Sequence, residues 1–133
     1  MIAGIADTHT ALWYLHKNPS LSVGARTFID DAARPGNEIG LSPISLTEIV
    51  YLVEKGRLPS SAYEDLKGAL GDPDYVIEET PFNRDIVDAM RRIPRVEVPD
   101  MPDRIIAATA IYFGVPVLSR DGRIRAASVQ TVW

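Results

Sequence analysis

The chain has 133 residues, of which 46% are apolar and 24% charged, a mix typical of a globular protein rather than a disordered one. It contains no cysteine, which excludes a disulfide scaffold, a thiolate zinc site and a cysteine nucleophile. The formal net charge of −4 argues against indiscriminate nucleic-acid binding. A chain of this length suits one domain, so we expect a single domain that spans residues 1–133.

The first half of the chain alternates apolar runs with helical patterns. The short apolar run Ile2–Ala6 predicts a buried strand that ends directly at Asp7. This run is too short for a signal peptide, and no other run is long enough to span a bilayer, so we expect a cytoplasmic protein without a membrane partner. The elements expected next are helix, helix, strand, helix and helix, at Thr10–His16, Val23–Ala33, Glu38–Leu41, Ser45–Lys55 and Ser60–Leu70.

The second half repeats this alternation. The expected elements are strand, helix, helix, strand, a helical turn and a last strand, at Tyr75–Glu78, Asn83–Arg92, Pro102–Phe113, Val115–Ser119, Arg123–Ala127 and Val129–Trp133. Strands that alternate with helices predict an α/β domain with a central, mostly parallel sheet. Ligands of such sheets gather at the carboxyl ends of the strands, so this edge is where we expect the functional residues.

Four acidic residues follow predicted strands or open a predicted helix, at positions that a parallel sheet can bring to one edge. They are Asp7, Glu48, Asp103 and Asp121. Several carboxylates at short range repel one another unless a cation neutralises them. Because the chain has no cysteine and only two histidines, the oxygen donors suit Mg²⁺ or Mn²⁺ rather than zinc. Such ions activate water for in-line attack on a phosphodiester, so the joint pattern predicts a metal-dependent phosphodiester hydrolase.

Each of these acids also has a structural explanation when it is taken alone. Asp7 can cap a helix, and Glu48 forms a capping-box pattern with Ser45. Asp103 in a first helical turn stabilises the helix dipole, and Asp121 stands in an Asp-Gly turn. The convergence of the four, rather than any one of them, favours a catalytic site.

Polar and basic residues stand beside these acids. We expect Thr8 and Ser119 to belong to the substrate-binding residues, where each can hold a carboxylate or a metal-bound water, although hydroxyls near helix starts are more often caps. Arg104 and Arg120 can contact a substrate phosphate or pair with the acids themselves. From Arg91 to Arg125 there are seven arginines and four acids, which indicates either a basic patch beside an acidic pocket or a solvated helix face.

Three further positions keep two interpretations each. Asp100 is either the N-cap of the helix that contains Asp103 or a second acid at the same place. His9 either contacts a phosphate or a carboxylate near the pocket or has a structural role. Trp13 stands at an apolar helix position, which is more typical of a core or a dimer interface than of a platform for base stacking.

Four segments together form a recognisable pattern. They are Ile5–Trp13, Ser45–Ile49, Asp100–Ala110 and Leu118–Asp121. The most specific part is D-R-I-I-A-A-T-A followed by G-V-P-V-L-S-R-D, and the D-T-H-x-x-L-W start is also fairly specific. In order and spacing, these segments resemble the PIN-domain family, and within it the VapC-like ribonuclease toxins of toxin–antitoxin pairs, over essentially the whole chain.

The resemblance implies a three-layer α/β/α sandwich with strand order near 3-2-1-4-5. It implies an acidic pocket of Asp7, Glu48, Asp103 and Asp121 that holds one or two Mg²⁺ or Mn²⁺ ions and cleaves RNA endonucleolytically, often tRNA or a ribosomal RNA loop. It also implies a homodimer and a small VapB-like antitoxin whose C-terminal tail fills the groove. The chain departs from the family at Met101-Pro102, where a large apolar residue is common, and Asp121 is the family's most variable acid.

Other functions fit this sequence less well. A haloacid-dehalogenase-like phosphatase needs a second aspartate two residues after the first, where this chain has His9, and it also needs a late lysine. A receiver-type signalling domain needs that late lysine too, and no lysine follows Lys67. A PIN module that binds RNA or a protein without cutting, and a housekeeping RNA-processing nuclease, both remain open. The presence of all four acids counts against the non-catalytic module.

Overall fold

The computed structural model describes residues 1–133, apart from the side chain of residue 126. Its five strands form one sheet in the order β3-β2-β1-β4-β5, and each neighbouring pair is parallel. The strands are β1 (Ile2–Ala6), β2 (Glu38–Leu41), β3 (Ile77–Glu79), β4 (Val117–Leu118) and β5 (Thr131–Val132). The parallel sheet expected from the alternating elements and the strand order that the resemblance implied are both confirmed.

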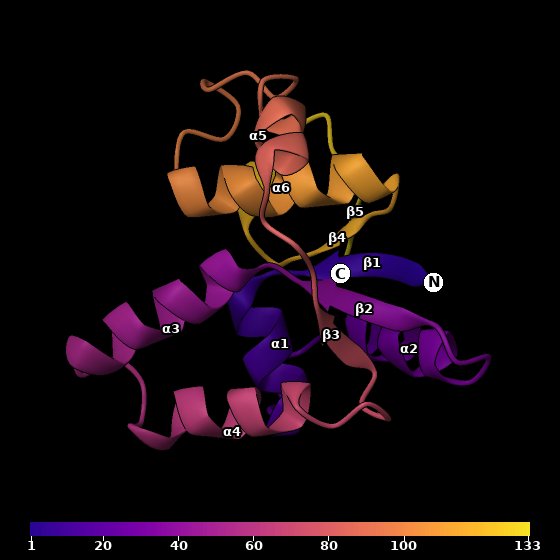
Figure 1. The fold of residues 1–133 in the computed structure, drawn as a ribbon, viewed down its shortest axis with the longest axis vertical. Helices are drawn as coiled ribbons and strands as arrows, with labels where there is room; N and C mark the ends of the chain where they lie inside the picture. Colours follow the sequence, from indigo (N-terminus) through magenta and orange to yellow (C-terminus); the bar gives the residue numbers. More distant parts are fainter.

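Helices cover both faces of this sheet (Figure 1). They are α1 (Thr8–Leu15), α2 (Val23–Ala33), α3 (Pro43–Glu54), α4 (Ser61–Leu70), α5 (Arg84–Met90), α6 (Met101–Phe113) and α7 (Gly122–Ala126). In Figure 1, α5 and α6 lie on one side of the sheet, whereas α1, α2, α3 and α4 lie on the other. The three-layer α/β/α arrangement that was predicted is therefore confirmed.

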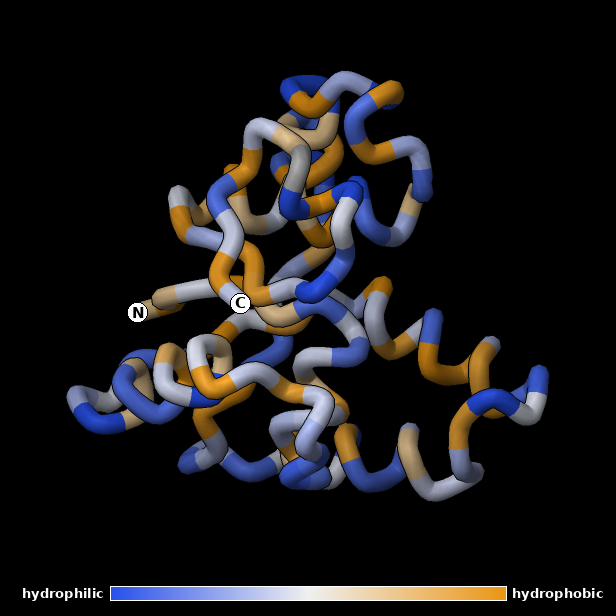
Figure 2. Tube along the Cα trace, turned by 180° about the vertical axis from the view of Figure 1, so that it is seen from behind, coloured by the Kyte–Doolittle hydropathy of each residue, from blue (hydrophilic) through white to orange (hydrophobic). Residues whose placement is uncertain are grey.

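The period-two geometry of the central strands builds the two halves of the core. Successive side chains of a strand point to opposite faces. Ile5 of β1 accordingly packs among the residues of α5 and α6, whereas Ala6 packs among those of α1, α2 and α4. Val117 and Leu118 of β4 divide between the same two clusters. Apolar and hydrophilic stretches alternate along the helices, as the orange and blue colours of Figure 2 show. Each helix can therefore turn one face toward the core.

Two glycines are required where they stand. Gly40 of β2 lies so close to its neighbours that a Cβ atom would come within 2.5 Å of Thr80 Cγ2 and 2.7 Å of Ile5 Cδ1. Gly114 ends α6 with a φ of +68°, a left-handed conformation that side chains disfavour. The first glycine allows close packing beside the central strand, and the second turns the chain from α6 toward β4.

The boundaries of some elements differ from those predicted, for reasons that involve proline. Helix α3 begins at Pro43, two residues earlier than predicted, because Ser42 caps it and proline is favoured in a first helical turn. Strand β4 is confined to Val117–Leu118 within the predicted Val115–Ser119, since Pro116 has no N–H to donate to a ladder. No helix in the described residues is long and apolar enough to cross a bilayer.

Candidate active site

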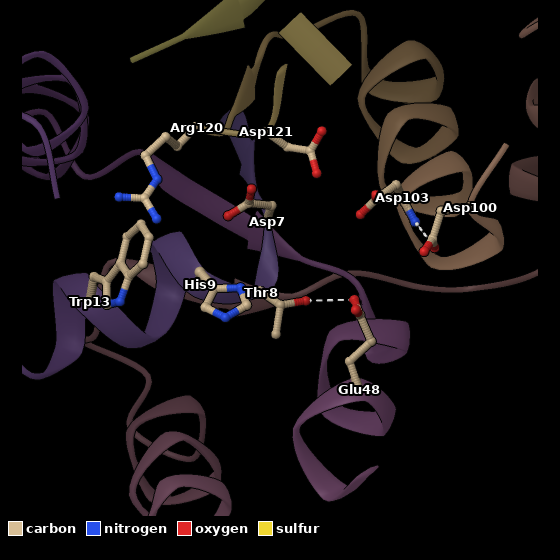
Figure 3. Close-up of a pocket in the computed structure, with 9 residues that line it drawn as sticks. All are labelled: Asp7, Thr8, His9, Trp13, Glu48, Asp100, Asp103, Arg120 and Asp121. Carbon is tan, nitrogen blue, oxygen red and sulfur yellow. Dashed lines mark hydrogen bonds between the residues drawn. The ribbon is translucent and has the colours of Figure 1, made fainter. Parts of the chain in front are cut away.

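A cavity of about 290 Å³ opens at the carboxyl ends of β1 and β4 (Figure 3). Most of its lining side chains are acidic, and they come from segments far apart in the sequence. The lining residues are Asp7, Thr8, His9, Trp13, Glu48, Asp100, Asp103, Arg120 and Asp121. The fold thus brings together the four predicted acids, with Asp100 as a fifth.

Asp7 and Asp121 follow the two neighbouring central strands and are held by one serine. Asp7 caps α1, and its Oδ1 accepts a hydrogen bond of 2.9 Å from the backbone N–H of Thr10. Its other oxygen, Oδ2, accepts from the buried hydroxyl of Ser119. The Ser119 Oγ in turn accepts from the backbone N–H of Asp121 at 3.0 Å. Ser119 therefore orients one acid directly and fixes the backbone of the other, so contact with a carboxylate is the one of its possible roles that the structure shows.

Capping explains part of what Asp7 and Asp121 do but nothing of what Glu48 does. Asp121 caps α7 through Oδ1, which accepts from the N–H groups of Arg123 and Ile124. The capping box of Ser45 and Glu48 does not form, because α3 begins at Pro43 and its cap is Ser42. Glu48 consequently lies in the second turn of α3, beyond the free N–H groups of the helix end.

Thr8 holds the Glu48 side chain in place. The Thr8 Oγ1 lies 2.7 Å from Glu48 Oε1 and 3.0 Å from the hydroxyl of Ser45, and the Thr8 residue is only 4% exposed. A hydroxyl has one proton, and the carboxylate is the stronger acceptor, so Thr8 donates to Glu48. Of the roles considered for Thr8, contact with a carboxylate is therefore the one that the structure shows, and Figure 3 draws it as a dashed line.

Asp103 lies in the most strongly perturbed electrostatic environment of the pocket. Partial burial, followed by the charges of Asp100, Asp121, Glu48 and Asp7, raises its pKa to about 7. Asp100 fulfils both of its proposed roles, because it lines the pocket and also caps α6 by accepting from the Asp103 N–H at 3.4 Å. The pocket thus concentrates negative charge that no protein cation pairs with in the described structure.

Glu48 shares this environment to a smaller degree. Burial raises its pKa, the hydrogen bond from Thr8 lowers it, and the charge of Asp100 raises it again. The residual upward shift means that two of the predicted ligands are harder to ionise than free carboxylates. A bound cation would reverse both shifts, because it favours the charged form of each acid.

The donor set suits a hard divalent cation, although the carboxylates stand apart. Within the described part of the chain, no three acidic or histidine side chains converge closely enough to surround an ion as they stand. Mg²⁺ commonly keeps several of its waters and is held by only one or two carboxylates. The residues present therefore fit an ion held partly through water better than an ion enclosed by protein oxygens.

The two predicted phosphate-binding arginines have different positions. Arg120 lines the pocket, and its guanidinium lies 4.7 Å from the centre of the Trp13 ring. Arg104 does not line the pocket; it donates to the carbonyl of Ile93 at 2.9 Å and to that of Met90 at 3.2 Å. It thereby ties the end of α5 to α6, and this placement favours a structural role over substrate contact.

His9 and Trp13 form an aromatic wall of the pocket. Their rings lie 5.4 Å apart, one helical turn from each other on α1. The expectation that Trp13 belongs to a core is only half met, because the ring packs against the first core cluster and also lines the cavity. His9 and Trp13 stand four residues apart in the helix that follows Asp7. This spacing could have indicated from the sequence that both rings lie at the site.

Comparisons with known proteins agree with this fold. The sequence model described as the PIN domain matches residues 5–129. The structure of VapBC2 from Rickettsia felis, bound to a DNA fragment from their promoter, contains a similar chain with a TM-score of 0.70, 20% identity and coverage of 98% of this chain and 97% of that one. A chain of FitAcB from Neisseria gonorrhoeae has a TM-score of 0.59 at 20% identity, over 96% of this chain and 95% of that one. No curated protein matches the chain by sequence.

Proposed function

The chain belongs to the PIN-domain family, and on this premise we propose that it is an endoribonuclease that depends on Mg²⁺ or Mn²⁺. The observation that carries the proposal is the convergence of Asp7, Glu48, Asp103 and Asp121 on one cavity at the carboxyl edge of a parallel sheet. Burial and the neighbouring negative charges raise the pKa of Asp103 and of Glu48, a cost to the folded protein that a cation would remove.

The roles of the residues follow from their contacts. Asp7, Glu48 and Asp103 would hold the ion directly or through water, and Asp121 would support a second ion or a water. When bound, the ion would supply the Lewis acidity that activates water and stabilises phosphate oxygens. Ser119 and Thr8 orient their carboxylates before any ligand arrives. Arg120 lies across the cavity from Asp100 and Asp103 (Figure 3), and there it would bind the RNA backbone.

We further propose that this nuclease is the toxin of a toxin–antitoxin pair, acting on tRNA or another structured RNA. The sequence pattern resembles VapC-like toxins, and the fold is similar to chains of VapBC2 and FitAcB. A VapB-like antitoxin could place a basic residue among the five carboxylates of the cavity, which offer it complementary charge. A homodimer, common in the family, belongs to the same proposal.

One observation favours a second candidate, a PIN module that binds RNA or a protein without cutting it. Among the residues that the structure describes, no three potential ligands stand in contact distance of one ion. Such a module would keep the cavity and its charge but show no metal-dependent cleavage. A housekeeping RNA-processing nuclease, by contrast, would cleave as the toxin does and differ in having no antitoxin partner.

The decisive experiment is cleavage of total RNA and of purified tRNA by the full chain, freed of any antitoxin. The reactions contain Mg²⁺, Mn²⁺ or EDTA and compare the wild type with Asp7→Asn, because asparagine keeps the cap of α1 while removing the charge. Asp88→Asn, an exposed acid of α5 outside the cavity, is the matched control. We expect discrete fragments that require metal and Asp7 but not Asp88.

The other outcomes separate the candidates. Absence of cleavage by folded wild-type protein over both RNA samples would overturn the catalytic proposal and favour the binding module. Cleavage that persists in EDTA, or that Asp7→Asn retains in full, would contradict the assigned metal site. Growth arrest on expression that a co-expressed VapB-like partner relieves would support the toxin, whereas cleavage without arrest would favour the housekeeping nuclease.

A further inference from the structure

Arg120 lines an acidic cavity and yet is not paired with its acids. It is next to Asp121 in the sequence, and four more carboxylates line the same cavity. Throughout the described structure, no carboxylate lies within 4.0 Å of the Arg120 guanidinium nitrogens. The guanidinium lies instead over the Trp13 ring, 4.7 Å from its centre, as Figure 3 shows. Although Arg120 is exposed, its guanidinium thus lies at the indole rather than at a carboxylate.

Trp13 is well fixed for this task. It lies on α1, is half-buried, and packs against the first core cluster. The ring of Trp133 contacts it at 6.0 Å between centroids, and the His9 ring contacts it at 5.4 Å. Because these neighbours restrict its motion, the Trp13 ring presents a preformed surface for a cation.

Stacking and ion pairing have different consequences for an arginine. The five N–H donors of a guanidinium lie in its plane, so stacking on a ring occupies the face and leaves the donors free. Pairing with Asp7 or Asp121 would occupy these donors and neutralise acids that a metal ion needs. Arg120, which lies over the indole and forms no ion pair with the acids, thus leaves the neighbouring carboxylates available.

We infer that Trp13 is a positioning residue that holds the Arg120 guanidinium away from the pocket carboxylates, where it binds an RNA phosphate adjacent to the one that is cut. The inference rests on the proposed nuclease function and adds a residue that sets how the substrate backbone is held. Without the indole, the guanidinium turns to Asp7 or Asp121, and the phosphate contact is lost although Arg120 is still present.

The test measures RNA binding by the full chain with cleavage disabled by Asp103→Asn, which leaves Asp7 and Asp121 in place as competing partners of Arg120. The probe is a fluorescein-labelled oligouridylate of 12 nucleotides with Mg²⁺, read by anisotropy between 50 and 200 mM KCl. In this background, we expect Arg120→Gln and Trp13→Leu each to weaken RNA binding about tenfold. Each should also reduce the steepness of the plot of log association constant against log salt concentration by about 0.7, the value for one phosphate contact to a single strand. Combining the two substitutions should weaken binding no further.

Two control variants separate positioning from general damage. Trp13→Phe keeps an aromatic face and should retain most of the affinity and of the salt slope. Arg123→Gln removes an exposed arginine of α7 that does not line the cavity, and its effect should add to that of Trp13→Leu. Melting temperatures show whether each variant is folded.

A second measurement does not need RNA. In the free protein, the ring current of Trp13 should shift the Nε–Hε resonance of Arg120, and Trp13→Phe should reduce this shift without unfolding the chain. If the Nε–Hε resonance of Arg120 has the chemical shift of a solvent-exposed arginine far from any ring, the inference is overturned whatever the binding data show.

The outcomes distinguish this inference from the proposed function. Additive losses, or an unchanged salt slope in Trp13→Leu, would overturn the role of Trp13 and leave the nuclease proposal intact. Failure of the parent protein to bind oligouridylate, together with absence of RNA cleavage by the wild type, would overturn the proposed function and this inference with it.

Discussion

At the scale of single residues, Asp103 lies where function and stability oppose each other. Its carboxyl is half-buried among four other acids, which raises its pKa to about 7 from the usual 3.8. The folded state therefore binds a proton that the unfolded state releases near pH 4. The protonated carboxyl stabilises the fold fully below about pH 4, and this contribution is lost as the pH rises through about 7.

Because the ionised form of Asp103 destabilises the fold, we expect Asp103→Asn to stabilise the protein in the presence of EDTA. The variant should unfold at a higher temperature than the wild type at pH 8, where Asp103 is charged, and at about the same temperature at pH 4. The gain at pH 8 should be about 1 kcal/mol or less, a few degrees, because the carboxyl is partly open to water. Differential scanning calorimetry across this pH range measures it. An equal gain at both pH values would show that charge is not the cause.

Thr8 provides a second prediction at this scale. Thr8→Val keeps the shape of the side chain but removes the hydroxyl that lies 2.7 Å from Glu48 Oε1. We expect the concentration of Mg²⁺ or Mn²⁺ needed for half-maximal RNA cleavage to rise about tenfold, since the partners of ligating carboxylates commonly change metal affinity by that factor. Thr47→Val, which removes an exposed hydroxyl of α3, should leave the metal requirement unchanged. Equal metal curves for both variants would contradict the orienting role.

At the scale of elements, the order and type of the helices and strands could be predicted from the sequence better than their boundaries. Strand β1 and helix α2 have the predicted bounds, because apolar periodicity and flanking breakers define them locally. The start of α3 was placed two residues too late because Ser45 and Glu48 imitate a capping box, whereas Ser42 and the proline after it form the real start. The position of Glu48 in the early turns of the helix that follows β2 was nevertheless sufficient to identify it as a pocket residue.

Arg104 illustrates what local patterns could not supply. Its partners are carbonyls of Met90 and Ile93, at the end of α5 and in the chain just beyond it, whose path depends on tertiary packing. From the sequence, adjacency to Asp103 suggested a contact with substrate. The same limitation applied to the contact of Trp13 with Arg120, because it joins positions more than 100 residues apart.

The observed contacts of Arg104 predict the effect of Arg104→Met. The substitution removes the hydrogen bonds that tie α5 to α6 and should lower the free energy of unfolding by about 2 kcal/mol, the usual range for bonds from a charged donor. RNA affinity of the folded protein should stay the same. Urea denaturation and anisotropy measure the two effects, with the exposed Arg92→Met as control. A loss of RNA affinity without a loss of stability would contradict the structural role and indicate that Arg104 contacts the substrate.

At the scale of the whole molecule, the site exists only when both helical layers dock on the same strand. Glu48 comes from α3 on one side of the sheet, Asp103 from α6 on the other, and Asp7 from the end of β1 between them. Folding therefore brings together acids that repel one another, in a protein whose net charge is already −4. The repulsion opposes the docking of the two layers, and a divalent cation would relieve it.

A metal ion is accordingly expected to stabilise the fold as well as to serve the reaction. A ligand that binds only the folded state at 100 times its Kd adds about 2.7 kcal/mol, so saturating Mg²⁺ or Mn²⁺ should raise the melting temperature by several degrees over EDTA. Asp7→Asn and Asp103→Asn should lose most of this gain, whereas Asp88→Asn outside the cavity should keep it. KCl at matched ionic strength controls for general screening. A metal-induced rise that is the same in all four proteins would place the ion elsewhere and remove the main physical reason for gathering these carboxylates at one edge of the sheet.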